Sequence, residues 1–105
     1  MNSTSVVFDT TQLQAKFKHA SDFWVSGNWS KDAALQFENA LKAHIDGSAT
    51  QVIQGTYRGN PVTHFFDPQT GLNVMKDPAG NFLSGWKLTP GQIKNITTTG
   101  KLGGG

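Results

Sequence analysis

The sequence predicts an α+β fold in which two N-terminal helices pack on a four-stranded antiparallel β-meander. Apolar residues recur at helical spacing up to position 45, and at a spacing of two from position 51 onwards. Turn-forming residues at 58–61, 67–71 and 77–80 separate the later apolar stretches so tightly that neighbouring strands must be antiparallel. Helices first and strands afterwards also argue against βαβ units.

The first helix is expected to begin at Thr10 or Thr11, because a threonine hydroxyl can accept hydrogen bonds from the free amides of a first turn. It is expected to end near positions 26–27, where a serine and a glycine follow one another. Its buried stripe consists of Leu13, Phe17 and Ala20.

The second helix is expected to be capped by Asn28 or Ser30, with the acidic Asp32 favoured in its first turn by the helix dipole. Gly47 is a suitable C-terminal cap. Its apolar face consists of Ala34, Phe37, Leu41 and Ile45.

Four strands are expected at 51–57, 62–66, 72–76 and 81–88. A chain of 105 residues supports one hydrophobic core, so residues 1–105 form a single domain. Its ends, 1–9 and 101–105, are expected to be flexible. No apolar run reaches the length of a membrane span, and the first residues lack the pattern of a signal peptide.

The charged residues are distributed unevenly. The formal net charge is only +2, but 12–20 and 80–105 contain lysines and no acidic residue. If these two stretches meet in the fold, they form one cationic face that suits an anionic partner. The lysines in question are Lys16, Lys18, Lys87, Lys94 and Lys101.

The three histidines are the side chains that titrate near neutral pH. On an ideal helix, Lys16 and His19 lie on one side of the apolar stripe, whereas Lys18 lies about 100° from His19. Convergence of all three needs a non-ideal helix or a ligand that spans both flanks; a solvated helix face is the simpler interpretation. Structural roles are expected for His44, at a helix C-terminus, and for His64, which points inward from a strand.

The last predicted strand combines a hydroxyl, an indole and an ammonium group. Ser84 and Trp86 share one face by the period of two, and Lys87 lies opposite or at the strand end. Recognition of single-stranded RNA uses this combination, because a base stacks on the ring while lysines bind phosphates. A buried core tryptophan is the alternative. Trp24 and Trp29, between the helices, are expected to be packing residues.

Other chemistries find little support. The chain has no phosphate-binding loop, zinc-protease motif or nucleophile elbow. It has no cysteine, its carboxylates are not paired at informative spacings, and its histidines do not have metal-ligand spacing. Neither a metal nor another cofactor is expected.

Three stretches carry a family resemblance: KFKHASDF (16–23), VIQGTYRGNPVTHFFDPQTGLNVM (52–75) and GNFLSGWKL (80–88). Their order resembles the C-terminal nuclease domains of the colicin D type, which occur in bacteriocins and contact-dependent inhibition toxins. The resemblance runs from about Leu13 to Leu88, and Lys-Phe-Lys-His-Ala with Ser-Gly-Trp-Lys is its specific part. It implies helices against an antiparallel sheet, and a metal-independent endoribonuclease that cuts tRNA in the anticodon loop.

The resemblance also implies site residues, position by position. His19 matches the catalytic histidine, and the 2′-hydroxyl of the RNA would serve as nucleophile, so that an imidazole need only move a proton. Lys18, Trp86 and Lys87 are the expected RNA-binding residues, Lys87 by adjacency; whether His44 or His64 joins the site is open. The expected catalytic set is His19, Lys16, Lys18, Ser84 and Trp86.

The partners follow from the same resemblance. They are a tRNA substrate and an acidic cognate immunity protein, with no membrane for the isolated domain. The domain would be the C-terminal part of a secreted or cell-surface bacterial toxin and act in the target-cell cytoplasm. The alternatives are a non-catalytic RNA-binding module that uses Trp24, Trp29 and Trp86, and an inert structural β domain.

Overall fold

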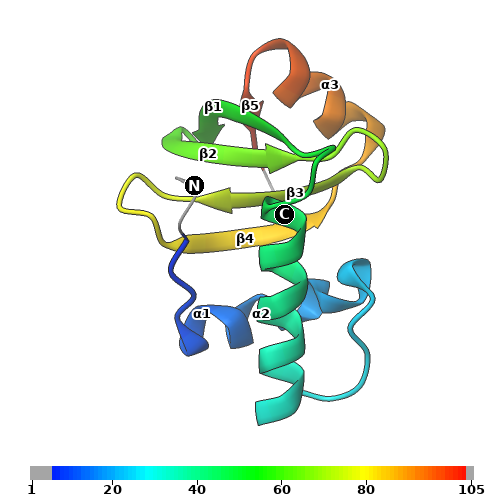
Figure 1. The fold of residues 1–105 in the computed structure, drawn as a ribbon. Helices are drawn as coiled ribbons and strands as arrows, with labels where there is room; N and C mark the ends of the chain where they lie inside the picture. The colour runs from blue at the N-terminus through cyan, green and yellow to red at the C-terminus, as the bar shows by residue number, and fades with distance from the viewer. Residues whose placement is uncertain (1–5, 104–105) are drawn as a thin grey trace.

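The computed structural model describes residues 6–103 and has helices first, then a sheet, as predicted (Figure 1). The predicted α+β class is confirmed, whereas the number of elements is not. Within the described range, the elements are α1 (Thr10–Ala15), the 3₁₀-helix η1 (Phe17–Phe23), α2 (Lys31–Ile45), β1 (Gln51–Tyr57), β2 (Asn60–Phe66), β3 (Leu72–Lys76), β4 (Phe82–Lys87), α3 (Pro90–Thr98) and β5 (Lys101–Leu102).

The sheet has five strands in residues 6–103, in the order β4-β3-β2-β1-β5. The predicted meander β1 to β4 is antiparallel throughout. The expectation of a purely four-stranded antiparallel sheet is wrong, because β5 adds a parallel pairing with β1, Thr56 beside Lys101 and Tyr57 beside Leu102. β5 has only two residues, and they form a strand only because they pair with the distant β1, so no local sequence pattern predicts it.

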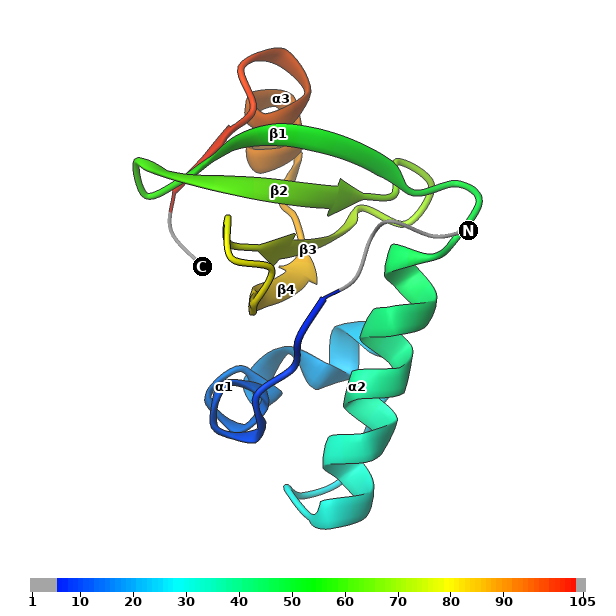
Figure 2. The same cartoon turned by 60° about the vertical axis from the view of Figure 1, so that its left-hand side comes forward.

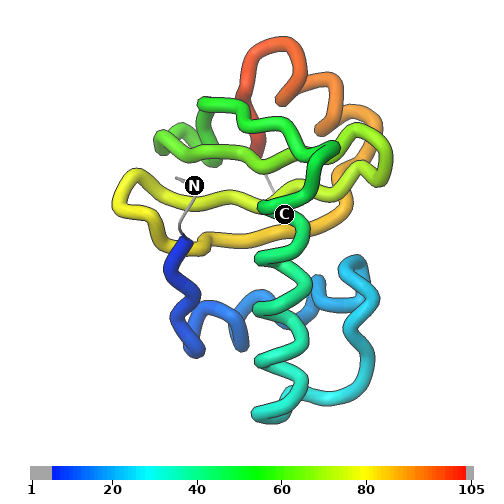
Figure 3. The backbone as a smooth tube through the Cα atoms, in the orientation of Figure 1, coloured from blue at the N-terminus to red at the C-terminus, as the bar shows by residue number. Residues whose placement is uncertain are grey.

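The helix α3 is also absent from the expected elements. Thr89 accepts a hydrogen bond from the amide of Gln92 at 3.2 Å, and the Gln92 side chain accepts one from the amide of Thr89 at 3.0 Å. This reciprocal capping box, with Pro90 in the first turn, starts the helix. α3 then carries the chain from one edge of the sheet to the other, where β5 pairs with β1 (Figure 3).

The first helical segment changes geometry at Lys16, where φ is −105° and ψ is 6°. α1 ends there, and η1 continues with three residues per turn, so side chains three positions apart stand in one row. The predicted single helix is thus two shorter ones, and its end at Phe23 precedes the predicted 26–27. One row faces the core (Phe17, Ala20, Phe23), one is exposed (Lys18, Ser21, Trp24), and one is half-buried (Lys16, His19, Asp22).

The second helix forms largely as predicted. Ser30 caps α2 and accepts a hydrogen bond from the amide of Ala33 at 3.0 Å. The N-cap of α1 is Asp9, without a side-chain hydrogen bond, rather than a threonine. The buried residues of α2 are Ala33, Phe37, Leu41 and Ile45, so Ala33 replaces the predicted Ala34, which is half-buried.

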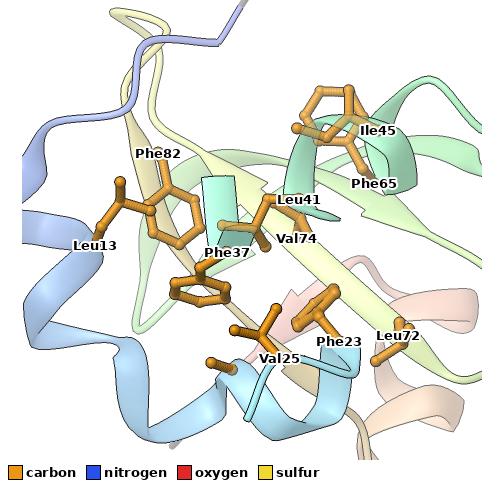
Figure 4. Close-up of a cluster of buried hydrophobic side chains, with 11 residues drawn as sticks. Leu13, Phe23, Val25, Phe37, Leu41, Ile45, Phe65, Leu72, Val74 and Phe82 are labelled. Atoms are coloured by element: carbon orange, nitrogen blue, oxygen red, sulfur yellow. The ribbon is translucent and has the colours of Figure 1, made fainter. Parts of the chain in front are cut away.

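The buried apolar residues form two hydrophobic clusters, one on each face of the sheet. Figure 2 shows the curled sheet between α2 and α3. One cluster joins η1 and α2 to the sheet, and Figure 4 shows Phe37 and Leu41 of α2 beside Phe82 and Val74 of the strands. The other cluster lies beneath α3 and consists of Val62, Phe66, Met75, Trp86, Leu88, Ile96 and Leu102. Trp86 of β4 therefore belongs to the second cluster.

The ends predicted to be flexible are 1–9 and 101–105. Of these, residues 1–5 and 104–105 lie outside the described residues. In the described part, the amide of Val7 donates to Gly80 at 2.9 Å, and the amide of Phe82 donates to Val7 at 2.9 Å. Lys101–Leu102 form β5. No helix among the described residues is long and apolar enough to cross a membrane.

Candidate active site

The imidazole of His19 lies against the indole of Trp86. Their ring centroids are 5.6 Å apart and the ring planes are inclined by 32°. The two residues come from η1 and β4, which are distant in the sequence and adjacent in space. The helix that carries the lysines and the strand that carries the indole thus meet at this pair of rings.

Two hydrogen bonds fasten the helical segment to β4 on either side of His19. The side chain of Gln12 in α1 donates to the carbonyl of Leu83, the residue left unpaired where the register between β3 and β4 shifts. Asp22 in η1 accepts a hydrogen bond from the amide of Lys87 at 3.0 Å. The position of the imidazole is therefore set from both ends of the segment.

Trp86 is itself held by the start of α3. Its indole N–H donates to the side-chain oxygen of Gln92 at 3.3 Å, the same oxygen that completes the capping box. The ring is 6% exposed and also packs on Tyr57, with centroids 6.0 Å apart. Trp86 is thus held in place beside His19. It is packed as a buried core tryptophan, the alternative that the sequence left open.

Positive charges surround the imidazole. Burial lowers the pKa of His19, the charge of Lys18 lowers it further, Asp22 raises it and Lys16 lowers it. Burial also lowers the pKa of Lys16, followed by the charges of Lys18 and Arg58. Within residues 6–103, none of these three cations forms a salt bridge. Cations gathered without carboxylate partners favour the binding of an anion such as a phosphate.

His19 differs from the other two histidines in its hydrogen bonds. Its Nε2 atom is buried, and its ring makes no hydrogen bond within residues 6–103. His44 donates from Nε2 to the carbonyl of Phe65 at 2.8 Å, beside the expected helix end. No hydrogen bond within residues 6–103 therefore ties the ring of His19 to the fold, whereas the ring of His44 is tied to the carbonyl of Phe65.

His64 is a buried structural residue, as its inward direction predicted. It is 0% exposed; its Nε2 lies 3.0 Å from the carbonyl of Gly100, and its Nδ1 accepts from the Asn73 side chain at 3.1 Å. Burial lowers the pKa of His64, as it does that of His44, so both rings are held neutral.

The remaining predicted residues are not all at the same place. Ser84 lies on the same face of β4 as Trp86 and is 0% exposed, and its hydroxyl has no hydrogen-bond partner within residues 6–103. Lys87 is exposed and lines a separate hollow of about 420 Å³ with Asp22 and Trp24. The structure thus brings together His19, Trp86, Lys16 and Lys18, buries Ser84 nearby, and places Lys87 beyond the Asp22 hydrogen bond.

The tryptophans between the helices differ from each other. Trp29 packs as predicted, with its ring 5.3 Å from that of Phe17. The expectation that Trp24 packs is wrong, because its side chain is 79% exposed and its φ of 63° points the chain into a left-handed cap. The alternative of an RNA-binding module needs exposed indoles at Trp24, Trp29 and Trp86. Of these, Trp29 and Trp86 pack against other residues of the fold.

Sequence reasoning missed two residues of this site, Asp22 and Arg58. The spacing of Lys16, His19 and Asp22 is three and three, which is the signal for one row of a 3₁₀-helix. Arg58 carries no comparable signal, since only the pairing of β1 with β2 and β5 brings it towards Lys16.

No cluster of three or more potential metal ligands occurs among the described residues.

Comparisons with known proteins agree with one another. A family model described as Colicin D matches residues 12–96. Colicin-D from Escherichia coli is 38% identical over an alignment of 87 residues. The match covers 79% of this chain and 12% of that protein, so the chain spans a small part of that relative. A solved structure described as a ribonuclease from Escherichia coli complexed with its inhibitor protein is 33% identical, covers 87% of this chain and 100% of its own, and gives a TM-score of 0.76.

Proposed function

Because the chain belongs to the colicin D family, we propose that it is a ribonuclease toxin domain that cuts tRNA in the anticodon loop without a metal ion. The observation that carries the proposal is the free imidazole of His19, packed on Trp86 among unpaired cations. Structural likeness to a ribonuclease, at 33% identity, supports the same reaction class.

The chemistry needs no protein nucleophile. The 2′-oxygen of the RNA forms a bond to the adjacent phosphorus, and the bond from phosphorus to the 5′-oxygen breaks. His19 takes the 2′ proton, and the departing 5′-oxygen takes up a proton from water and leaves as a hydroxyl. Burial and the neighbouring lysines lower the pKa of His19, so the imidazole is neutral and able to act as base at neutral pH. General base catalysis of this kind contributes roughly 10²–10⁴-fold.

Negative charge accumulates on the phosphate oxygens as phosphorus acquires its fifth bond. Lys16 and Lys18 supply the opposite charge from the two flanks of η1, one half-buried and one exposed. Cations at this position stabilise the transition state more than the ground state, because the phosphate oxygens carry more negative charge in the transition state. The charges of both lysines act on the imidazole, since each of them lowers the pKa of His19.

Trp86, Ser84 and Lys87 have secondary roles in this proposal. Trp86 holds the plane of the imidazole, since its ring has little exposed surface on which a base could stack. The hydroxyl of Ser84 is buried on the same face of β4 as Trp86, and within residues 6–103 it has no hydrogen-bond partner, so it remains available as a donor. Lys87 binds the RNA backbone outside the reaction centre, from the neighbouring hollow.

A ribonuclease of this kind must be inhibited in the cell that produces it. We therefore propose an acidic immunity protein as partner, since the ribonuclease similar in structure was solved with its inhibitor. Acidic residues would be steered to the cationic site and bind fast. The domain would be the C-terminal part of a secreted or cell-surface toxin that acts in the cytoplasm of the target cell.

The test is cleavage of total tRNA by the purified chain in EDTA, with fragments mapped to their tRNA. Wild-type protein should release fragments cut in the anticodon loop, and His19→Ala should leave tRNA intact while folding normally. Lys42→Ala is a matched control, because the Lys42 ammonium already pairs with Glu38 at 2.8 Å. Intact tRNA with wild-type protein at high concentration contradicts the proposal. Binding without cleavage would instead support the RNA-binding module.

A further inference from the structure

The loop of the hairpin between β1 and β2 contains a residue that is unusual at its position in such a loop. This two-residue loop consists of Arg58 and Gly59, both with positive φ, 52° and 83°, between the paired Tyr57 and Asn60. Such loops favour asparagine, aspartate or glycine at the first of these positions, because a side chain there crowds the backbone. An arginine at this position points to a use for its side chain.

Both the backbone and the side chain of Arg58 are held in place. Its amide donates to the carbonyl of Leu102 in β5 at 2.8 Å. Its guanidinium carbon lies 5.2 Å from the centroid of the Tyr57 ring, a cation–π arrangement. The arginine is therefore presented from a fixed position, and less side-chain freedom is lost when it binds a ligand.

A continuous row of rings joins this arginine to the reaction centre. The Tyr57 ring lies 6.0 Å from that of Trp86, and Trp86 lies 5.6 Å from His19. The charge of Arg58 is also close enough to Lys16 to act on it. Like charges repel, and within residues 6–103 no carboxylate forms a salt bridge with either of them. A phosphate between the hairpin and η1 would relieve this repulsion.

Resting on the function proposed above, we propose that Arg58 binds a phosphate of the RNA beside the cleaved bond, across from Lys16 and Lys18. The planar guanidinium donates two parallel N–H bonds to phosphate oxygens, which a lysine cannot do. Substrate would then be held from two parts of the fold, η1 and the β1–β2 hairpin.

The test compares Arg58→Asn with Arg58→Lys, and uses Lys42→Ala as a charge control. Asparagine suits the left-handed backbone, so Arg58→Asn should melt at the wild-type temperature or above. Its kcat/KM for tRNA should fall at least about tenfold, the worth of one charged hydrogen bond. Arg58→Lys should recover only part of this loss, and Lys42→Ala should match wild type.

Affinity for intact tRNA is measured in the His19→Ala background, so that binding is read apart from cleavage. The slope of log affinity against log salt should fall in magnitude by about 0.7–1 when Arg58→Asn is added. Wild-type kcat/KM and an unchanged slope would overturn the role of Arg58 alone. Loss of affinity for the acidic inhibitor with unchanged tRNA affinity would also overturn it. A wild-type chain that does not cut tRNA contradicts the proposed function itself.

Discussion

The carboxylate of Asp22 accepts a hydrogen bond from the backbone amide of Lys87 at 3.0 Å. This contact ties the end of η1 to the end of β4, and so keeps His19 beside Trp86. Asp22 stands three residues after His19, in the same row of the 3₁₀-helix, and its charge raises the pKa of the imidazole. The carboxylate of Asp22 thus holds η1 in position against β4 and also places a negative charge near the imidazole of His19.

Asp22→Asn separates these two contributions. Asparagine keeps an oxygen that can accept the Lys87 amide, but it loses the negative charge. The pKa of His19 should therefore fall further below its ordinary value, because the lysines lower it without opposition. Titration of the His19 ring followed by NMR measures this directly. The acid limb of kcat/KM should move to lower pH in the same variant.

The control for Asp22→Asn is Asp32→Asn, which changes an exposed carboxylate in the first turn of α2. It should leave the His19 titration unchanged. A pKa of His19 that rises, or does not move, in Asp22→Asn would show that this carboxylate does not act on the imidazole.

Gly55→Ala should destabilise the protein strongly. A Cβ at Gly55 would lie 2.0 Å from the carbonyl oxygen of Gly100, a backbone atom that cannot turn aside. That oxygen also accepts the amide of Thr56 at 2.9 Å and lies 3.0 Å from His64 Nε2, so moving it disturbs β5 and the buried histidine together. The expected loss is roughly 1–3 kcal/mol or more, measured by urea unfolding.

Gly91→Ala is the matched comparison for Gly55→Ala. Gly91 lies in α3, and a Cβ there meets no atom within 4 Å. Alanine should stabilise the helix by up to about 1 kcal/mol. Similar unfolding free energies for the two variants would contradict the close approach of β1 and the segment before β5.

Trp24→Gly should stabilise the fold, even though it removes a large apolar side chain. Trp24 adopts φ 63° as the cap of η1, where glycine is preferred, and its side chain is 79% exposed. Relief of the left-handed strain is worth about 1–2 kcal/mol, and little burial is lost. A lower melting temperature for Trp24→Gly would mean that the indole packs on the molecule in solution.

Acid should destabilise the protein through its buried histidines. The pKa of His64 is lowered in the folded state, so the unfolded chain binds more protons as the pH falls through about 6.5. Stability is therefore greatest above that pH and is lost below it, with a slope of at most about 1.4 kcal/mol per pH unit for each such histidine. Urea unfolding at pH 8 and pH 5.5 should show a smaller difference for His64→Gln than for wild type. Equal differences would contradict a neutral His64.

Much of the fold was predictable, because strong local signals agree with the tertiary structure. Alternating apolar residues and Asp-Pro turns placed β1 and β3 at their observed bounds and β2 and β4 within two residues. α3 carried a signal too, since Thr89-Pro90-Gly91-Gln92 has the spacing of a capping box with proline in the first turn. The threonines that follow, and Gly91, are weak helix formers and concealed it.

Other features depend on tertiary contacts that no short stretch records. β5 exists only through its pairing with β1, and Arg58 approaches Lys16 only because the hairpin is held there by β5. The proximity of His19 and Trp86 was expected from the family resemblance, and the 3₁₀ geometry that aligns His19 with Asp22 was not. A helical period of 3.6 cannot distinguish that row from an ordinary helix flank over so few residues.

The most direct test of the central claim is the chemistry of the ends that the chain leaves on tRNA. Wild-type protein in EDTA should release anticodon-loop fragments that carry a 2′,3′-cyclic phosphate and a 5′-hydroxyl, and mass spectrometry of the fragments identifies both. His19→Ala should release none. Fragments with 3′-hydroxyl and 5′-phosphate ends, or cleavage by His19→Ala at the wild-type rate, would contradict proton transfer by His19 beside Trp86.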